Sequence, residues 1–95
     1  MDQKEKLVRK YSNPEKVQEL ARKMKLNPVG ISTRKDKKYM IYDNQGHVKH
    51  FGQLPYHDFT KTGDETKRDH FRARNHDWYD APKYSPAYLS AWLLW

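Results

Sequence analysis

Aromatic residues are concentrated in the second half of this chain, and this concentration is the strongest constraint on its fold. Of the 13 aromatic residues, 12 lie between Tyr39 and Trp95, and only Tyr11 precedes them. A module of about 57 residues buries a smaller fraction of its surface than a larger one does. Aromatic side chains compensate because each buries a large apolar area with few rotatable bonds. We therefore expect residues 37–95 to form a compact module around a small aromatic core.

Net charge follows the opposite distribution. Residues 1–40 contain 12 Lys and Arg against 5 Asp and Glu, whereas residues 41–95 contain 7 of each. The whole net charge of +7 therefore belongs to the first 40 residues. This division predicts two parts, a basic helical arm with its linker over residues 1–36 and the aromatic module over 37–95. It favours a binding or assembly protein over an enzyme.

The first part has the pattern of an amphipathic helix. Asn13 can cap it, Pro14 suits its first position and Glu15 suits the positive end of the helix dipole. Apolar residues then recur at helical spacing, which predicts a helix that ends near Leu26. Residues 2–11 could add an earlier helical turn or two, and residues 29–31 a short strand. The apolar stripe consists of Val17, Leu20, Ala21 and Met24.

The second part has the pattern of a hairpin followed by helices. Residues 39–42 and 47–51 have strand character, and the turn residues 43–46 separate them. Asp64 or Thr62 can cap a helix over residues 65–74, whose one large apolar residue is Phe71. Ser85 and Pro86 start a last short helix that is apolar almost all round and must be buried, against the hairpin or against another chain. We therefore predict an α+β fold with a basic N-terminal helix, a small antiparallel hairpin or sheet, two short C-terminal helices and an aromatic-rich core.

The sequence contains no pattern that indicates catalysis. With no cysteine, neither a disulfide nor a thiolate metal site is possible. The five histidines have no zinc-ligand spacing, and none of the four glycines belongs to a phosphate-binding loop. No base is marked beside a Ser or Thr nucleophile. We predict that the protein is not an enzyme and has no metal, cofactor or small-molecule substrate.

The ends of the sequence bear on where the protein resides. The N-terminal residues lack the apolar run of a secretory signal. The longest apolar stretch, residues 91–95, is far shorter than the roughly 20 residues that span a bilayer. We expect a soluble, non-secreted protein of a reducing compartment, without a membrane partner.

The basic residues of the first part have two interpretations. A high density of Lys and Arg is typical of surfaces that bind the phosphate backbone of nucleic acid. Alternatively, the helix docks by its apolar stripe, and its lysines only keep it soluble. Arg68, Arg72 and Arg74 are balanced by nearby acids, so we expect structural ion pairs there. The candidate nucleic-acid-binding residues are Lys16, Arg22, Lys23, Lys25, Arg34, Lys35, Lys37 and Lys38.

Several short motifs, in order, make residues 37–95 resemble a known family. They are residues 50–52 (HFG), 56–60 (YHDFT), 64–68 (DETKR), 71–74 (FRAR) and the apolar end 91–95 (AWLLW). The family consists of small uncharacterised proteins of large DNA viruses of algae and protists and of some tailed phages. Asn75-His76 departs from the Arg-His common there after the helix. The family has no established reaction or cofactor, so the resemblance implies only a viral setting.

Two functional hypotheses follow. The first is a non-enzymatic, virion-associated minor structural or cementing protein, located in the virion or in the host-cell cytoplasm or nucleus. Its partners are viral structural proteins, bound by the terminal helix through Tyr88, Trp92 and Trp95. The alternative is a DNA-binding or other nucleic-acid-binding module that uses the basic arm on phosphates.

The motifs also have a local interpretation. Gly52 allows the chain to turn sharply as it leaves the hairpin. Tyr56 and Phe59 are expected to cover the apolar face of the hairpin. The arginines of the following helix suit bidentate contact with a carboxylate such as Asp58. The same residues also serve to hold a small fold together.

Overall fold

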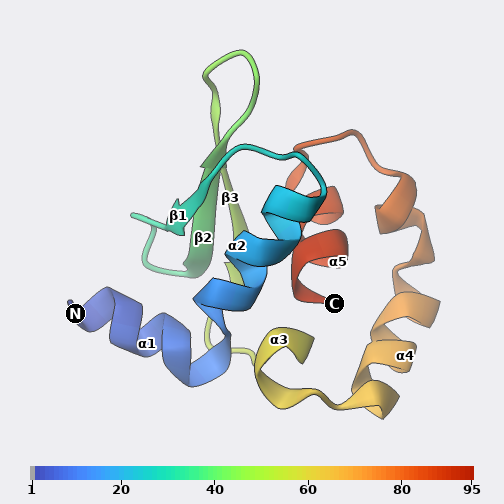
Figure 1. Ribbon diagram of the computed structural model, residues 1–95. Helices are drawn as coiled ribbons and strands as arrows, with labels where there is room; N and C mark the ends of the chain where they lie inside the picture. Colours follow the sequence, from blue (N-terminus) through green and yellow to red (C-terminus); the bar gives the residue numbers. More distant parts are fainter. Residues whose placement is uncertain (1) are drawn as a thin grey trace.

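The protein has an α+β fold, with helices gathered around a three-stranded antiparallel sheet (Figure 1). The computed structural model describes residues 2–95. In chain order the elements are α1 (Gln3–Tyr11), α2 (Pro14–Lys23), β1 (Val29–Ile31), β2 (Lys37–Tyr42), β3 (Val48–Gln53), α3 (Phe59–Thr62), α4 (Glu65–Arg74), the 3-10 helix η1 (His76–Asp80) and α5 (Pro86–Leu94).

The helices begin where short polar side chains can cap them. Asn13 accepts a hydrogen bond from the Lys16 amide before α2, and Asp64 accepts one from the Lys67 amide before α4. Ser85 does the same for the Tyr88 amide before α5. Each cap satisfies a backbone N–H that the first helical turn leaves free. These three predicted starts are confirmed.

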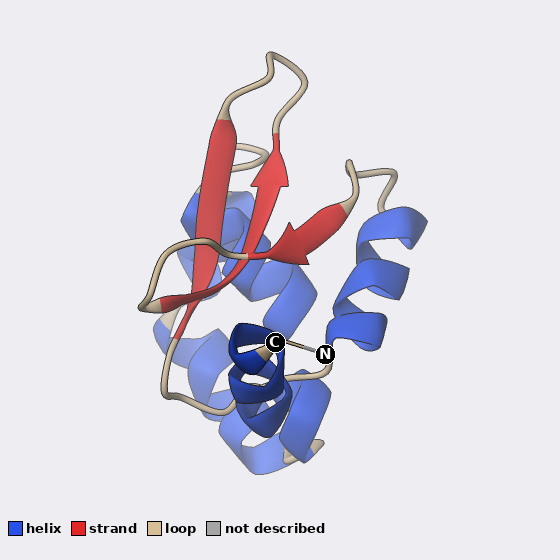
Figure 2. Ribbon diagram, turned by 90° about the vertical axis from the view of Figure 1, so that its left-hand side faces the viewer, coloured by secondary structure: helices blue, strands red, loops and turns tan. Residues whose placement is uncertain are grey.

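The predicted hairpin is also confirmed, as strands β2 and β3 with Tyr39 paired to Phe51 and Ile41 to Lys49. Strand β1 pairs antiparallel with the other edge of β2 and completes the sheet. Figure 2 shows the strands with the helices gathered on one side and beneath them. Because side chains alternate along a strand, Tyr39, Ile41 and Phe51 all point into the core, where each is almost completely buried.

Gly52 is required by close packing within β3. Its φ of +83° is a conformation that favours glycine. A Cβ atom there would lie 3.1 Å from Leu94 Cδ1 and 3.1 Å from Lys38 Cβ. The missing side chain makes room for the stem of Lys38 on one strand and for α5 on the other side.

One hydrophobic core joins both halves of the chain. Its buried members come from α1, α2, the sheet and α5, and from the connecting segments through Leu26 and Tyr84. The packing crosses the expected boundary at residue 36, because β1 pairs with β2 across it and α2 contacts α5. An amphipathic helix buries its apolar stripe wherever a matching surface exists. The core comprises Val8, Val17, Ala21, Leu26, Tyr39, Ile41, Phe51, Tyr84, Leu89, Leu93 and Leu94.

Helix α5 rests on its own chain, against β3, η1 and α2. Helix α4 has no buried residue and lies at the edge of the molecule (Figure 1). It is held chiefly by Phe71, whose ring stacks on that of Trp95 with centroids 4.7 Å apart. Phe71 is its apolar anchor, as predicted, and Arg68 and Arg72 add hydrogen bonds to Trp95 that were not predicted.

The remaining differences from the expectations are local. Helix α2 ends at Lys23 rather than near Leu26, and Lys25 follows with a φ of 59°. Helices α3 and η1 were not predicted. Tyr56 does not cover the hairpin, since 66% of it is exposed. Among residues 2–95, no helix is long and apolar enough to cross a membrane.

Candidate functional site

Most of the predicted basic residues lie at the surface. Lys16, Arg22 and Lys23 are exposed on α2, Lys25 follows that helix, and Arg34 and Lys35 are exposed in the loop between β1 and β2. Lys37 is half-buried on β2, where its Nζ atom donates to Gln53 Oε1. Within residues 2–95, Lys23 is the one member of this set that forms an ion pair at the surface, with Glu19.

Lys38 is a correction to the predicted set. Only 2% of its side chain is exposed, and its Nζ atom lies 3.0 Å from Asp58 Oδ2, which is itself 1% exposed. Burial lowers the pKa of the Lys38 ammonium group, and the adjacent Asp58 carboxylate acts in the opposite sense. Lys38 therefore cannot reach a phosphate. The basic run in the sequence concealed this because β2 turns successive side chains to opposite faces.

A buried polar network surrounds this ion pair. Asp58 caps α3 by accepting hydrogen bonds from the Thr60 amide and hydroxyl. The Thr60 hydroxyl also contacts the Ser12 hydroxyl, to which Tyr39 donates at 2.7 Å. The network ties the sheet to α3 and to the junction of α1 and α2. Because each polar side chain of the network is paired with or hydrogen-bonded to another member, its role is structural.

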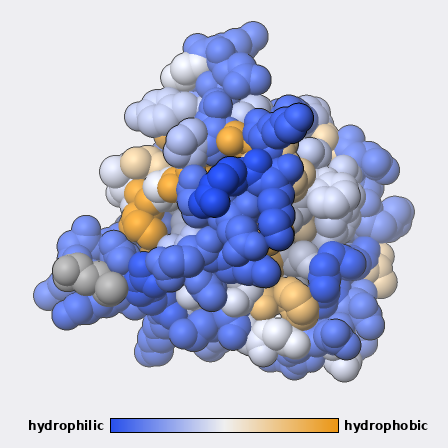
Figure 3. Space-filling model, viewed as in Figure 1, coloured by the Kyte–Doolittle hydropathy of each residue, from blue (hydrophilic) through white to orange (hydrophobic). Residues whose placement is uncertain are grey.

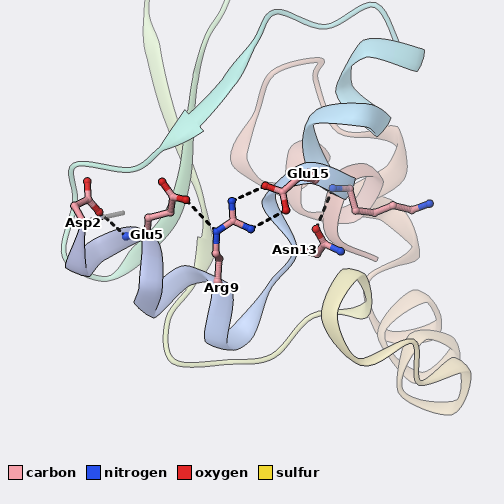
Figure 4. A network of polar contacts seen from close by, with 6 residues as sticks. Asp2, Glu5, Arg9, Asn13 and Glu15 are labelled. Carbon is pink, nitrogen blue, oxygen red and sulfur yellow. Dashed lines mark hydrogen bonds and ion pairs between the residues drawn. The ribbon is translucent and has the colours of Figure 1, made fainter.

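The cations of α1 are partly neutralised. Figure 4 shows Arg9 reaching Glu5 on its own helix and Glu15 at the start of α2. The two carboxylates raise the pKa of Arg9, and Arg9 lowers that of Glu15. Arg9 thus joins the two N-terminal helices and adds little to the positive electrostatic potential at the surface. Lys6 and Lys10 remain exposed on α1, and further exposed cations lie on α2 and after it.

A groove with basic walls separates α2 from α4, and we call it the α2–α4 groove. Its volume is about 530 Å³. Lys16 lies on the α2 wall, and Arg68 and Arg72 lie on the α4 wall. Lys23, two helical turns after Lys16, projects to the same side of α2. The apolar lining consists of Leu20, Met24, Phe59, Ala91, Trp92, Leu93, Leu94 and Trp95.

All the charged side chains that line this groove are positive. Of the residues described, no Asp or Glu lines it. In Figure 3, viewed as in Figure 1, patches of apolar surface appear among the hydrophilic residues of this face. A site with an apolar floor and cationic walls is complementary to an anionic partner that also carries an apolar group.

Arg68 and Arg72 do not contact Asp58, contrary to the expectation. Arg68 Nε donates to the backbone oxygen of Trp95 at 2.7 Å, and Arg72 Nη2 donates to the same atom at 3.1 Å. Asp58 is unavailable because it is buried with Lys38. Asp64, one of the nearby acids expected to balance these arginines, caps α4 instead. The spacing i, i+4, which puts both arginines on one helix face, was the signal that could have indicated their joint role.

The three residues proposed to bind a partner differ in accessibility. Tyr88 and Trp95 are half-buried and pack against the core. Trp92 is 43% exposed, and its Nε1 atom donates to the carbonyl oxygen of Tyr79 at 3.1 Å. Trp92 is therefore the member of this set most available to a ligand.

A second hollow, of about 570 Å³, is also lined by Trp95. Phe71 of α4, Trp78 of η1 and Trp95 after α5 line it, together with Lys37 and His57. Helix α4 is attached to Trp95 both by the Phe71 stack and by the hydrogen bonds of Arg68 and Arg72.

Ser32 and His50 form a close pair that the sequence did not indicate. Their Oγ and Nδ1 atoms are 2.7 Å apart, and Ser32 Oγ also accepts from the Arg34 amide. Ser32 is only 2% exposed, and within residues 2–95 no carboxylate hydrogen-bonds to His50. This pair links the β1–β2 loop to β3. In the same described residues, no group of three or more His, Cys, Asp or Glu side chains could hold a metal ion.

A family model described as a family of unknown function, DUF5754, matches residues 28–75, which is half of the 95 residues. The chain belongs to this family. No curated protein and no solved structure matches it.

The DUF5754 segment contains the sheet, α3 and α4, and it excludes α1, α2 and α5. Arg68 and Arg72 therefore lie within it. Lys16 and Trp92, on the facing side of the α2–α4 groove, lie outside it. The groove is formed where the DUF5754 segment meets the flanking helices.

Proposed function

We propose that this protein is a non-catalytic nucleic-acid-binding module that holds phosphates in and beside the α2–α4 groove. The observation that carries the proposal is the charge of the groove, which has cations on both walls and, among the described residues, no Asp or Glu side chain in its lining. Lys and Arg at such a surface attract the phosphate backbone and release its counterions. Arginine also binds phosphate oxygens in a bidentate manner.

Cations outside the groove extend the attractive field. Arg22, Lys25, Arg34 and Lys35 are exposed, and none of them forms an ion pair within residues 2–95. The net charge of +7 acts in the same direction. Such a field accelerates the approach of a polyanion and holds it without reading its sequence.

The packing of α5 favours this function over the assembly hypothesis. An apolar helix exposed to solvent would need a partner protein, but Leu89, Leu93 and Leu94 are buried within this chain. This burial weakens the case for a hydrophobic partner, whereas Arg22, Lys25, Arg34 and Lys35 have no ion-pair partner within residues 2–95.

A triple variant tests the proposal. Lys16→Gln, Arg68→Gln and Arg72→Gln together remove the three cations that line the groove. We expect the slope of log affinity against log salt to become shallower by about two units, because each lost phosphate contact on a single strand removes about 0.7. Fluorescence anisotropy of a labelled oligonucleotide over a salt series measures this slope.

The matched control removes the same charge elsewhere. Lys6, Lys10 and Lys83 are exposed and do not line the groove. Their replacement by Gln should leave the slope nearly unchanged. Equal slopes for the two triple variants would show that net charge alone acts, and no binding at low salt would refute the proposed function.

The assembly hypothesis remains a second candidate, favoured by the exposure of Trp92 and by the resemblance to small viral proteins. In this role the protein would be a minor structural or cementing component bound to viral structural proteins. It predicts a stoichiometric copy number in purified particles, which quantitative mass spectrometry measures. Absence from the particle would exclude the role.

A further inference from the structure

Trp92 lies at the junction of two adjoining hollows. It lines the α2–α4 groove together with Arg72, and the same two residues line a neighbouring hollow with His76 and Tyr79. The second hollow has a volume of about 290 Å³. Because the two hollows share Trp92 and Arg72, we call them together the path. Of the described residues, no Asp or Glu lines either part.

An aromatic ring and a cation occur side by side along this path. The ring of Trp92 packs edge-on against that of Tyr79, with centroids 5.0 Å apart, and remains 43% exposed. The Arg72 guanidinium carbon lies 5.7 Å from the centre of the Tyr79 ring. Arg72 gives one N–H to the Trp95 backbone oxygen and keeps the others for a ligand. Exposed aromatic rings beside cations are the elements by which proteins hold unpaired nucleotides.

We infer that the α2–α4 groove takes a single strand rather than a duplex, with a base stacked on Trp92 and the neighbouring phosphates on Arg72 and Lys16. This inference rests on the proposed function and specifies its ligand. A volume of about 530 Å³ falls within the range of pockets that enclose small organic groups, roughly 300–1,000 Å³. A duplex can touch the cationic rim, but it keeps its bases stacked inside, and extruding one is costly. An unpaired strand turns its bases outward freely.

Binding assays with three probes test the inference. Labelled oligothymidylate, oligouridylate and a mixed-sequence DNA duplex of the same length are titrated with the full chain. We expect both single strands to bind at least about tenfold more tightly than the duplex. The two single strands share the chemistry in question, and their ratio shows whether the 2′-hydroxyl matters.

Two variants of Trp92 separate stacking from general effects. Trp92→Leu should weaken single-strand binding by about fivefold to a hundredfold and leave duplex binding within about twofold. Trp92→Phe loses the same hydrogen bond to Tyr79 but keeps an aromatic face, so it should bind within about twofold of the parent. Single-strand binding should also quench the indole emission of the parent, and Trp92→Phe should bind while losing most of that quench. This readout does not depend on whether the Leu variant folds.

The outcomes distinguish the two proposals. Equal binding of single strand and duplex, with both weakened by the groove triple variant, would overturn the single-strand inference and leave phosphate binding intact. Loss of both ligands to the same extent in Trp92→Leu, or an unchanged quench in Trp92→Phe, would also overturn it. If none of the three probes binds at low salt, both proposals fail.

Discussion

The Lys38→Met variant is expected to lose about 3–5 kcal/mol of the free energy of unfolding, because it leaves the Asp58 carboxylate buried without its cation. Methionine approximates the length of the lysine stem and can occupy the space beside Gly52. The loss therefore reports the unpaired charge rather than a cavity. Urea denaturation followed by circular dichroism measures it.

Two further variants locate the cause. Lys37→Met changes the neighbouring lysine, which is half-buried and bonded only to Gln53 among the described residues, and should alter stability by less than about 0.5 kcal/mol. The double variant Lys38→Met/Asp58→Asn removes both charges while Asn keeps an oxygen to cap α3. It should regain a large part of the loss. A fully stable Lys38→Met protein would show that the Asp58 carboxylate is solvated.

The Leu93→Ala variant should lose about 2–5 kcal/mol, because Leu93 is completely buried where α5 meets the core. This result would locate α5 inside the fold of a single chain. If α5 instead required a partner, truncating Leu93 would change the stability of the isolated chain very little. Thermal or urea denaturation at several protein concentrations provides the measurement.

Leu7→Ala is the matched control for this prediction. It makes the same chemical change on α1, where Leu7 is 40% exposed, and should cost less than about 1 kcal/mol. Equal losses in the two variants would contradict the burial described for α5. A midpoint that rises with protein concentration would indicate that association contributes to the stability.

Local sequence patterns were sufficient to predict most of the elements. Asn13, Asp64 and Ser85 each precede a helix because a short polar side chain there satisfies a free amide, an interaction that needs only neighbours in the chain. The turn at residues 43–46 has the same local character. Helix α3 was missed because it has only four residues, too few for a periodic pattern.

The candidate site was predictable only in part. Lys16 and Lys23 were correctly placed on an amphipathic helix, since its apolar stripe determines which side chains remain outside. Arg68 and Arg72 were assigned to ion pairs with local acids, whereas they face the groove and bind the Trp95 backbone oxygen. That contact spans more than 20 residues of sequence, and no local pattern encodes it.

Sequence patterns alone thus establish the α+β class, the helix starts, the hairpin and the basic character of the first 40 residues, because all of these depend on composition or on nearby residues. Contacts between distant residues determine the rest. They bury Lys38 against Asp58, join the N-terminal helices to the aromatic module in one core, and turn α5 toward its own chain. They also separate α4 from α2 to leave a basic groove. The exposed cations of this protein border a groove only when α2, α4 and α5 are packed together.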